Sequence, residues 1–195
     1  MVILVLNCGS SSIKYQVIDM EAASSKVLAK GIVERIGLAE GDLVHKPVGK
    51  ERFELRQPIP DHTTGIRLVL DALTDPAHGV IRSLDEVKAV GHRVAHGGEF
   101  FPESCLVTEE VKEKIRSLFE IAPLHNPANL EGVLSIEKVL PGVPQVTVFD
   151  TSFHQTIPAV NYMYALPHAY YDKYRVRKYG FHGTSHRYVA RVGAE

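Results

Sequence analysis

The chain opens with Val2-Ile3-Leu4-Val5-Leu6-Asn7-Cys8-Gly9-Ser10-Ser11-Ser12-Ile13-Lys14, and this stretch decides the fold. An apolar run of strand length leads into small and polar turn residues. Residues 13–19 then alternate between apolar and polar side chains. The pattern predicts a β-hairpin whose tip, residues 7–12, is longer than the two-residue turn of an ordinary hairpin.

Such a tip has the composition of a phosphate-binding loop. Backbone N–H groups and serine hydroxyls can surround phosphoryl oxygens, and Lys14 can supply positive charge. The alternatives are a solvated hairpin loop and a solvated strand position for Lys14. The tip is not a P-loop, because the G-x-x-x-x-G-K-[ST] spacing is absent and a strand follows it instead of a helix.

Composition limits the classes of protein. With 195 residues, 45% hydrophobic and 23% charged, the chain is that of a soluble globular protein of about one domain. A net charge of −1 argues against a broad nucleic-acid interface, and the apolar runs are too short to cross a membrane. Residues 1–6 do not have the pattern of a signal peptide, so a cytoplasmic location is the default expectation. Cys8 and Cys105 cannot form a disulfide framework, and we expect two small, mostly buried thiols.

The remaining periodicity predicts an α/β fold. Residues 37–60 are expected to form a loop or an irregular strand pair, and 186–192 the first turns of another helix. The other expected elements are strands at 26–36, 87–93 and 143–149 and helices at 61–73, 108–119 and 129–140. Together they predict a mixed sheet with helical crossovers.

Functional groups of such a sheet belong in the loops that leave the strand ends. Arg93 ends one predicted strand, Asp150 follows another, and His125 and His182 lie in loops bounded by Gly and Pro. Arginine can clamp a carboxylate or phosphate with two hydrogen bonds. The histidines can donate to phosphoryl oxygens, and Asp150 can hold Mg²⁺ directly or through water. The implied chemistry is phosphoryl transfer.

Each of these residues has a plainer interpretation. The pairs His92/His96 and His182/His186 have the i, i+4 spacing of zinc ligands, but Gly-rich surroundings and the absence of H-E-x-x-H argue against a zinc site. A single histidine is usually a hydrogen-bonded structural residue. Asp150 alone could be a helix N-cap.

Five motifs in order resemble those of the acetate kinase family. They are Asn7-Cys8-Gly9-Ser10-Ser11-Ser12-Ile13-Lys14, Gly91-His92-Arg93-Val94-Ala95-His96-Gly97-Gly98, Ala122-Pro123-Leu124-His125-Asn126-Pro127, Phe149-Asp150-Thr151-Ser152-Phe153-His154 and Tyr179-Gly180-Phe181-His182-Gly183-Thr184-Ser185-His186. The resemblance implies a ribonuclease H-like domain of the actin/Hsp70/sugar-kinase superfamily. It also implies the reaction ATP + acetate ⇌ ADP + acetyl phosphate, with Mg²⁺ or Mn²⁺.

The resemblance also assigns roles by motif position. Arg93, His125, His182 and Asp150 would be catalytic, and Arg93 would also bind the substrate carboxylate. Asn7 and Asp150 would bind the metal, directly or through water. The phosphoryl groups would be bound by Asn7, Ser10, Ser12 and Lys14, and the substrate methyl group by an apolar pocket of Ala95, Leu124 and Phe181.

The sequence departs from the family in two ways. Ala95 stands where the family usually has Val, which enlarges the expected pocket and favours propionate. Family members are also about twice as long. Residues 1–195 are therefore expected to be an N-terminal domain that ends within an interdomain helix, without the C-terminal nucleotide-binding domain, and to have little activity alone. A homodimer is expected for the full-length enzyme. The alternatives are a propionate or butyrate kinase and a non-catalytic module that binds small anions.

Overall fold

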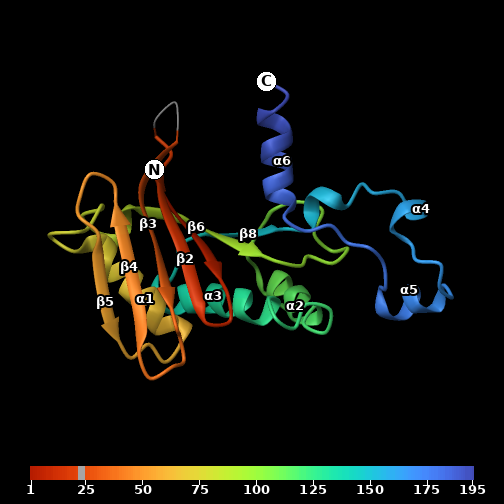
Figure 1. Cartoon of the computed structure of the whole chain (residues 1–195), viewed down its shortest axis with the longest axis horizontal. Coiled ribbons are helices and arrows are strands. Elements are labelled where there is room, and N and C mark those ends of the chain that lie inside the picture. Colours follow the sequence, from red (N-terminus) through yellow and green to blue (C-terminus); the bar gives the residue numbers. More distant parts are fainter. Residues whose placement is uncertain (22–24) are drawn as a thin grey trace.

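The structure is a computed structural model that describes residues 1–21 and 25–195. One mixed sheet of eight strands, in the order β5-β4-β3-β2-β1-β6-β8-β7, forms its centre (Figure 1). The strands are β1 Val2–Cys8, β2 Ser12–Asp19, β3 Lys26–Glu34, β4 Gly41–Pro47, β5 Phe53–Gln57, β6 Val87–Val94, β7 Cys105–Leu106 and β8 Gln145–Phe149. The expected mixed α/β fold is confirmed.

The β1–β2 hairpin has a shorter tip than expected. Asn7 pairs with Lys14 and Cys8 with Ile13, so the strands extend to a tip of residues 9–11 closed by a 2.8 Å bond from the Gly9 N–H to the Ser12 carbonyl. The prediction of a tip spanning residues 7–12 was wrong. Cys8 and Ile13 continue the alternation of buried side chains, and this burial extends the pairing.

Residues 37–60 contain a regular antiparallel hairpin instead of an irregular segment. β4 pairs with β3 on one side and with β5 on the other. The side chains of Leu43 and His45 point into the core, while Val44 and Lys46 lie on the opposite face. The high content of Gly and charged residues in this segment belongs to its turns and its outer face.

Helices α1 His62–Thr74 and α3 Asn126–Val139 pack side by side against one face of the sheet (Figure 1). The Asp61 carboxylate caps α1 at the Thr64 N–H, 2.7 Å away. The expected N-cap Thr108 begins α2 Glu109–Ser117. α3 begins earlier than predicted, at Asn126, because Pro127 is well tolerated in a first helical turn.

The last stretch of the chain contributes little to this core. It contains α4 Ala159–Tyr162, α5 Ala169–Tyr174 and α6 Gly183–Val192, and only Gly183 of these helices is buried. The short elements α4, α5 and β7, and the 3-10 turns Leu84–Glu86 and Ser152–His154, were not predicted. α6 was predicted to begin at 186 and begins three residues earlier. Within the described ranges, no helix has the length and apolarity needed to cross a membrane.

Candidate active site

The site begins where three neighbouring parallel strands end. β6 pairs in parallel with both β1 and β8, so the carboxyl ends of these strands lie at one edge of the sheet. Asn7 lies near the end of β1, Arg93 near the end of β6, and Asp150 directly after β8. Ligands of open α/β sheets bind at this edge.

Arg93 connects the three strand ends. Its Nη2 lies 2.6 Å from Asp150 Oδ2 and its Nε lies 3.1 Å from Oδ1, so the guanidinium donates to both carboxylate oxygens. The remaining Nη1 donates to Asn7 Oδ1 at 3.4 Å. The Asp150 side chain is only 5% exposed, whereas that of Arg93 is 32% exposed. The cation therefore covers a buried carboxylate and still faces solvent.

His182 joins this cluster from the start of α6. It has a left-handed backbone, with φ of 52°, and its Nδ1 lies 3.8 Å from Asp150 Oδ2. The next residue, Gly183, donates its N–H to the Asp150 carbonyl at 2.8 Å. A side chain at 183 would collide with that carbonyl, so glycine is required for this approach. The imidazole is 75% exposed and free to meet a ligand.

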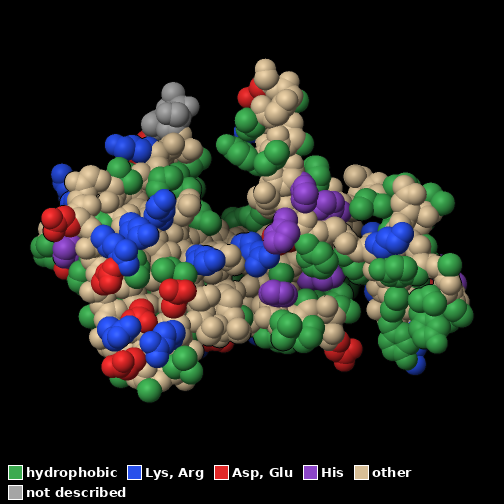
Figure 2. Space-filling view, in the orientation of Figure 1, with side chains coloured by type: hydrophobic (Ala, Val, Ile, Leu, Met, Phe, Trp, Pro, Cys, Tyr) green, Lys and Arg blue, Asp and Glu red, His purple; other side chains and the backbone are tan. Residues whose placement is uncertain are grey.

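These four side chains line one open cleft of about 640 Å³. Its lining residues are Asn7, Arg93, Asp150, His182, Thr184, Ser185 and Tyr188. Figure 2 shows histidine and basic side chains gathered in the middle of this face of the molecule, between the sheet and the last stretch of the chain. The cleft thus offers an arginine, an imidazole and hydroxyl groups to an anion.

His125, Ser10 and Ser12 lie in a different hollow of about 660 Å³, together with His62 and Leu124. His125 is the residue before α3, and the His62 Nε2 atom hydrogen-bonds to the Gly9 carbonyl at 2.7 Å. The β1–β2 hairpin contributes to both hollows: Asn7 lines the Arg93 cleft, and Ser10 lines the hollow that contains His125. The eight catalytic and phosphate-binding candidates are therefore distributed over neighbouring hollows.

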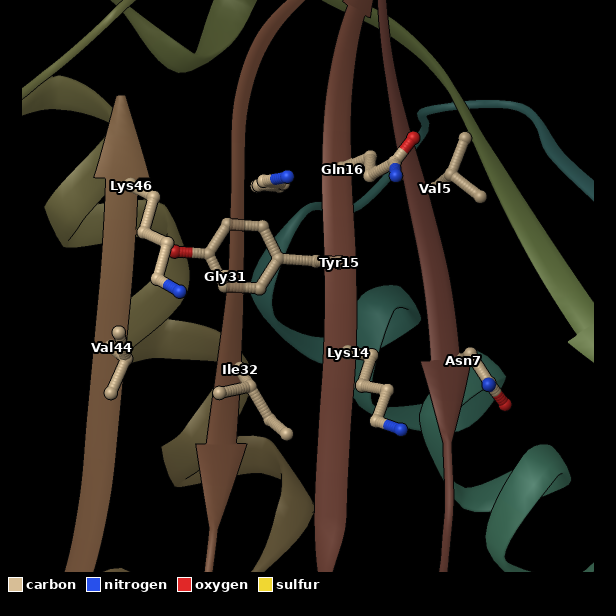
Figure 3. A pocket seen from close by; sticks show the side chains of 10 residues that line it. Val5, Asn7, Lys14, Tyr15, Gln16, Gly31, Ile32, Val44 and Lys46 are labelled. Carbon is tan, nitrogen blue, oxygen red and sulfur yellow. The ribbon is translucent and has the colours of Figure 1, made fainter. Parts of the chain in front are cut away.

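Lys14 lies on the open face of the sheet. Figure 3 shows Lys14 beside its cross-strand partner Asn7, in a hollow of about 530 Å³ that also contains Lys46 and Ile32. The position is that of an exposed strand residue, which was the plainer interpretation. Asn7 borders both this hollow and the Arg93 cleft.

The three residues expected to form the methyl pocket lie in different settings. Ala95 is 2% exposed, Leu124 is 78% exposed beside His125, and Phe181 is 45% exposed with its ring edge-on to His96 at 5.5 Å. The described part of the chain does not enclose them in one pocket.

His92 lies on β6 and His96 in the loop that follows it, and both are neutral structural groups. His92 Nε2 hydrogen-bonds to Gln145 Oε1 at 2.7 Å, and His96 Nδ1 accepts the Gly98 N–H at 2.9 Å. Burial lowers the pKa of both to about 4. Among residues 1–21 and 25–195, no three His, Cys, Asp or Glu side chains are grouped as metal ligands. Cys8 is buried, with its pKa raised to about 12 by burial, and Cys105 is partly buried.

Sequence reasoning missed several polar residues that hold the site together. The buried Asn126 and Asn129 side chains of α3 bind the loop after β6, and Thr151 Oγ1 accepts the Gly97 N–H at 2.9 Å. Two asparagines three residues apart, on the face of a helix that also carries Leu130 and Val133, were the available signal. Polar residues at core-facing helical positions need a specific hydrogen-bond partner.

The oxygen ligands present fit a magnesium ion. Mg²⁺ is usually bound through one or two carboxylates, with water and substrate phosphates completing its shell. Asp150 supplies one carboxylate and Asn7 an amide oxygen, and both groups accept hydrogen bonds from Arg93. These oxygen donors suit Mg²⁺, which prefers oxygen ligands to thiolate and imidazole.

A mixed sheet with helical crossovers and anion-binding groups at its carboxyl edge is characteristic of the actin/Hsp70/sugar-kinase superfamily, and solved kinase structures share the fold. A crystal structure of Porphyromonas gingivalis acetate kinase superposes with a TM-score of 0.91, at 47% identity over 98% of this chain and 49% of that chain. A propionate kinase from Francisella tularensis gives 0.90, at 39% identity over 99% of this chain and 48% of that chain.

The chain belongs to the acetokinase family, whose model matches residues 2–195. It is 57% identical over 193 residues to an acetate kinase of Thermotoga maritima, covering 99% of this chain and 47% of the relative. It is 54% identical over 195 residues to an acetate kinase of Desulfitobacterium hafniense, covering 100% of this chain and 48% of the relative. The chain thus spans about half the length of the curated relatives it matches.

Proposed function

We propose that this chain supplies one wall of the active site of an acetate kinase, which transfers a phosphoryl group from ATP to acetate and yields ADP and acetyl phosphate. The observation that carries the proposal is the convergence of Asn7, Arg93, Asp150 and His182 on one cleft in a chain of the acetokinase family. A module that only binds small anions would need fewer of these groups.

The acceptor chemistry explains why the cleft needs cations more than a base. A carboxylic acid such as acetic acid has a pKa close to that of Glu, about 4.3, so the nucleophile is already ionised at neutral pH. The difficulty is to bring an anionic carboxylate against an anionic phosphate. Arg93 and His182 offset that repulsion and stabilise charge as it develops. Both oxygens of Asp150 are paired with Arg93, which supports a positioning role instead of that of a general base.

Asp150 and Asn7 would hold Mg²⁺ or Mn²⁺, directly or through water. The bound ion would neutralise charge on the phosphates of ATP. Ser10, Ser12, Lys14 and His125 are proposed to contact the phosphoryl groups from the adjoining hollows. His125 is proposed as the second imidazole at the transferring group, because it precedes α3 beside the hairpin tip.

The domain organisation follows the same proposal. Residues 1–195 would form the N-terminal domain, with α6 as an interdomain helix and nucleotide binding completed by a C-terminal domain. The exposure of Tyr188 (62%) and Val189 (63%) on α6 supports this, because such side chains are commonly covered by further protein. A homodimeric, cytoplasmic enzyme is proposed for the complete protein. The chain alone would have little activity, since catalysis needs both walls of the cleft.

A propionate kinase is the second candidate. The specific observation is Ala95, in the loop that follows Arg93, where a larger residue would leave less space for the substrate chain. The similarity to the Francisella tularensis propionate kinase is compatible with either acetate or propionate as the substrate.

The test is acyl phosphate formation trapped with hydroxylamine. The chain would be joined to the part of the Thermotoga maritima acetate kinase that lies beyond the matched region, and assayed with ATP, Mg²⁺ and acetate, propionate or butyrate. The intact relative is the positive control, and the 195-residue chain alone is assayed in parallel. Turnover by the chimera that is lost on Arg93→Ala supports the proposal. A folded chimera without turnover on any of the three acids contradicts it.

A further inference from the structure

The ends of β1 and β6 are joined by one side chain, that of Asn129 on α3. Its Nδ2 donates to the Cys8 carbonyl at 2.7 Å, and its Oδ1 accepts the Ala95 N–H at 2.9 Å. Cys8 follows Asn7, and Ala95 lies two residues after Arg93. One buried amide therefore bridges the two segments that carry Asn7 and Arg93.

The bridge lies where the main-chain pairing stops. The parallel register of β1 and β6 ends at Leu6 and His92. Beyond this pair, the Cys8 carbonyl and the Ala95 N–H each bond to the Asn129 side chain instead of to one another. The amide of Asn129 thus takes the place of a ladder bond and sets how far apart the two strand ends lie.

A close helix approach makes this bridge possible. Gly132, one turn after Asn129, faces Cys8, and a Cβ atom at 132 would lie 2.5 Å from Cys8 Sγ and 3.1 Å from Cys8 Cβ. Any side chain at 132 would push α3 away from β1 and would withdraw Asn129 from the Cys8 carbonyl.

We propose that Asn129 is a positioning residue that fixes the separation of Asn7 and Arg93. The expected effect of Asn129 on phosphoryl transfer rests on the proposed function, whereas its two hydrogen bonds to the ends of β1 and β6 do not. Asn129 is buried and lines neither the Arg93 cleft nor the His125 hollow. It acts through the Cys8 carbonyl and the Ala95 N–H, and thereby holds the 3.4 Å approach of Arg93 Nη1 to Asn7 Oδ1.

Asn126 provides a matched control. It is an equally buried asparagine on the same helix, and its Oδ1 accepts the His96 N–H at 3.1 Å while its Nδ2 donates to the His96 carbonyl at 2.9 Å. Both of its bonds go to one residue of one loop. Loss of Asn126 should therefore loosen the His96 loop without uncoupling β1 from β6.

The first arm of the test needs no enzyme activity. In the isotopically labelled 195-residue chain, NMR would follow hydrogen exchange of the Ala95 N–H and the resonances of Arg93 Nε–H and the Asn7 side-chain amide. Asn129→Asp, which loses the donor to the Cys8 carbonyl, and Gly132→Ala should shift both side-chain signals, and Gly132→Ala should also speed Ala95 exchange at least about tenfold. Asn126→Asp should leave the Asn7 signal in place. Unchanged Asn7 and Arg93 signals in folded Asn129→Asp would overturn the proposal.

The second arm separates positioning from stability. The carboxyl group introduced by Asn129→Asp can restore both bonds only when it is protonated, because the Cys8 carbonyl needs a donor. In the chimera described above, kcat per folded molecule should fall about 100-fold at alkaline pH and recover relative to the unsubstituted chimera as the pH falls. If activity instead falls only in proportion to the fraction of folded molecules, with kcat per folded molecule unchanged, the positioning role is overturned. An inactive unsubstituted chimera would count against the proposed function, and the NMR arm would still decide the bridge.

Discussion

The Arg93 guanidinium and the Asp150 carboxylate form a two-pronged ion pair across the ends of β6 and β8, with Nη2 2.6 Å from Oδ2 and Nε 3.1 Å from Oδ1. Two of the three guanidinium nitrogens are thereby occupied, and Nη1 is the one directed at Asn7. An incoming anion can therefore bind at the N–H groups of Nη1 and at the second N–H of Nη2 without displacing the pair. The arrangement preorganises the arginine, because its side chain is held before any ligand arrives.

Arg93→Ala should impair both catalysis and folding. In the chimera with the second half of an acetate kinase, we expect kcat/KM to fall by about 10³ or more, because a charge that stabilises the transition state is lost. The free energy of unfolding of the 195-residue chain should fall by about 2 kcal/mol, because the buried Asp150 loses its partner. Steady-state kinetics and urea denaturation measure the two effects.

Arg93→Lys is the matched control. Lysine keeps the charge but lacks the planar fork that contacts both carboxylate oxygens. Most of the stability should return, while turnover should stay well below that of the unsubstituted chimera. Near-normal turnover of Arg93→Ala would contradict the catalytic assignment.

Gly31→Ala should disrupt the sheet at β3. An added Cβ would collide with the Val44 carbonyl and with the Tyr15 ring, whose hydroxyl bonds to His45 Nδ1 at 2.7 Å. We expect a loss of about 3 kcal/mol in the free energy of unfolding, since a buried contact cannot relax without moving backbone.

Gly91→Ala is the comparison for this prediction. Gly91 also lies in a strand of the same sheet, but the nearest heavy atom to an added Cβ is Val5 Cγ2 at 3.9 Å. Its change in unfolding free energy should be within about 1 kcal/mol. Equal losses of unfolding free energy in Gly31→Ala and Gly91→Ala would show that the collision with Tyr15 does not determine the destabilisation at position 31.

The sequence was sufficient for the central strands and the main helices because their periodicity is strong. Alternation in residues 13–19 and 26–36 and the helical spacing in 61–73 predicted elements that the structure confirms, although β3 ends at Glu34. Alternation through Asn7 and Cys8 was outweighed by turn composition, which led to the wrong tip length. α4, α5 and β7 went unpredicted, because such short elements have too little periodicity to detect.

The candidate site was predictable only in part. Motif position identified Arg93, Asp150 and His182, which the structure brings into one cleft. The division of Ser10 and His125 into a second hollow depends on where α3 packs against the hairpin, which periodicity does not give. The bridging role of Asn129 depends on a contact between residues 121 positions apart.

Stability should fall with acid because of His92. Burial lowers its pKa from 6.5 to about 4, so the unfolded chain takes up the proton first as the pH falls. The neutral form stabilises the fold above pH 6.5, and this contribution is lost as the pH falls from 6.5 toward 4. The loss should reach roughly 3 kcal/mol, as one pKa unit corresponds to about 1.4 kcal/mol.

Urea denaturation at a series of pH values would measure this effect. His92→Gln keeps a donor for Gln145 without a group that titrates in this range, and its unfolding free energy should depend less on pH over the same window. An unchanged slope in this variant, or an imidazole that titrates near 6.5 by NMR in the folded chain, would contradict the prediction.

Arg177 should hold the segment between β8 and α6 onto the body of the protein. Its side chain is 5% exposed, its Nη1 lies 2.6 Å from Glu99 Oε1, and its guanidinium lies 3.6 Å from the centre of the Tyr162 ring. Arg177→Gln should speed proteolytic cleavage within residues 156–181 about tenfold, because both the ion pair and the cation–π contact are lost.

Arg175→Gln is the control for Arg177. Arg175 lies 3.8 Å from the same glutamate but is 56% exposed, so its contribution should be small. Limited proteolysis under native conditions, with fragments identified by mass, compares the two. Similar cleavage rates for both variants would show that the burial of Arg177 does not hold the segment.

Ala95→Val should shift substrate preference toward acetate. Ala95 is buried two residues after Arg93, and its N–H is fixed by Asn129, so a larger side chain at 95 cannot easily move aside. Two added methyl groups would reduce the space for a propionate methyl, and one methylene is worth about 1–3 kcal/mol of discrimination. In the chimera, the ratio of kcat/KM for propionate to that for acetate should fall about tenfold or more. If the ratio instead stays constant while both activities persist, Ala95 does not line the acyl pocket, and the preference must be set by residues outside the loop after β6.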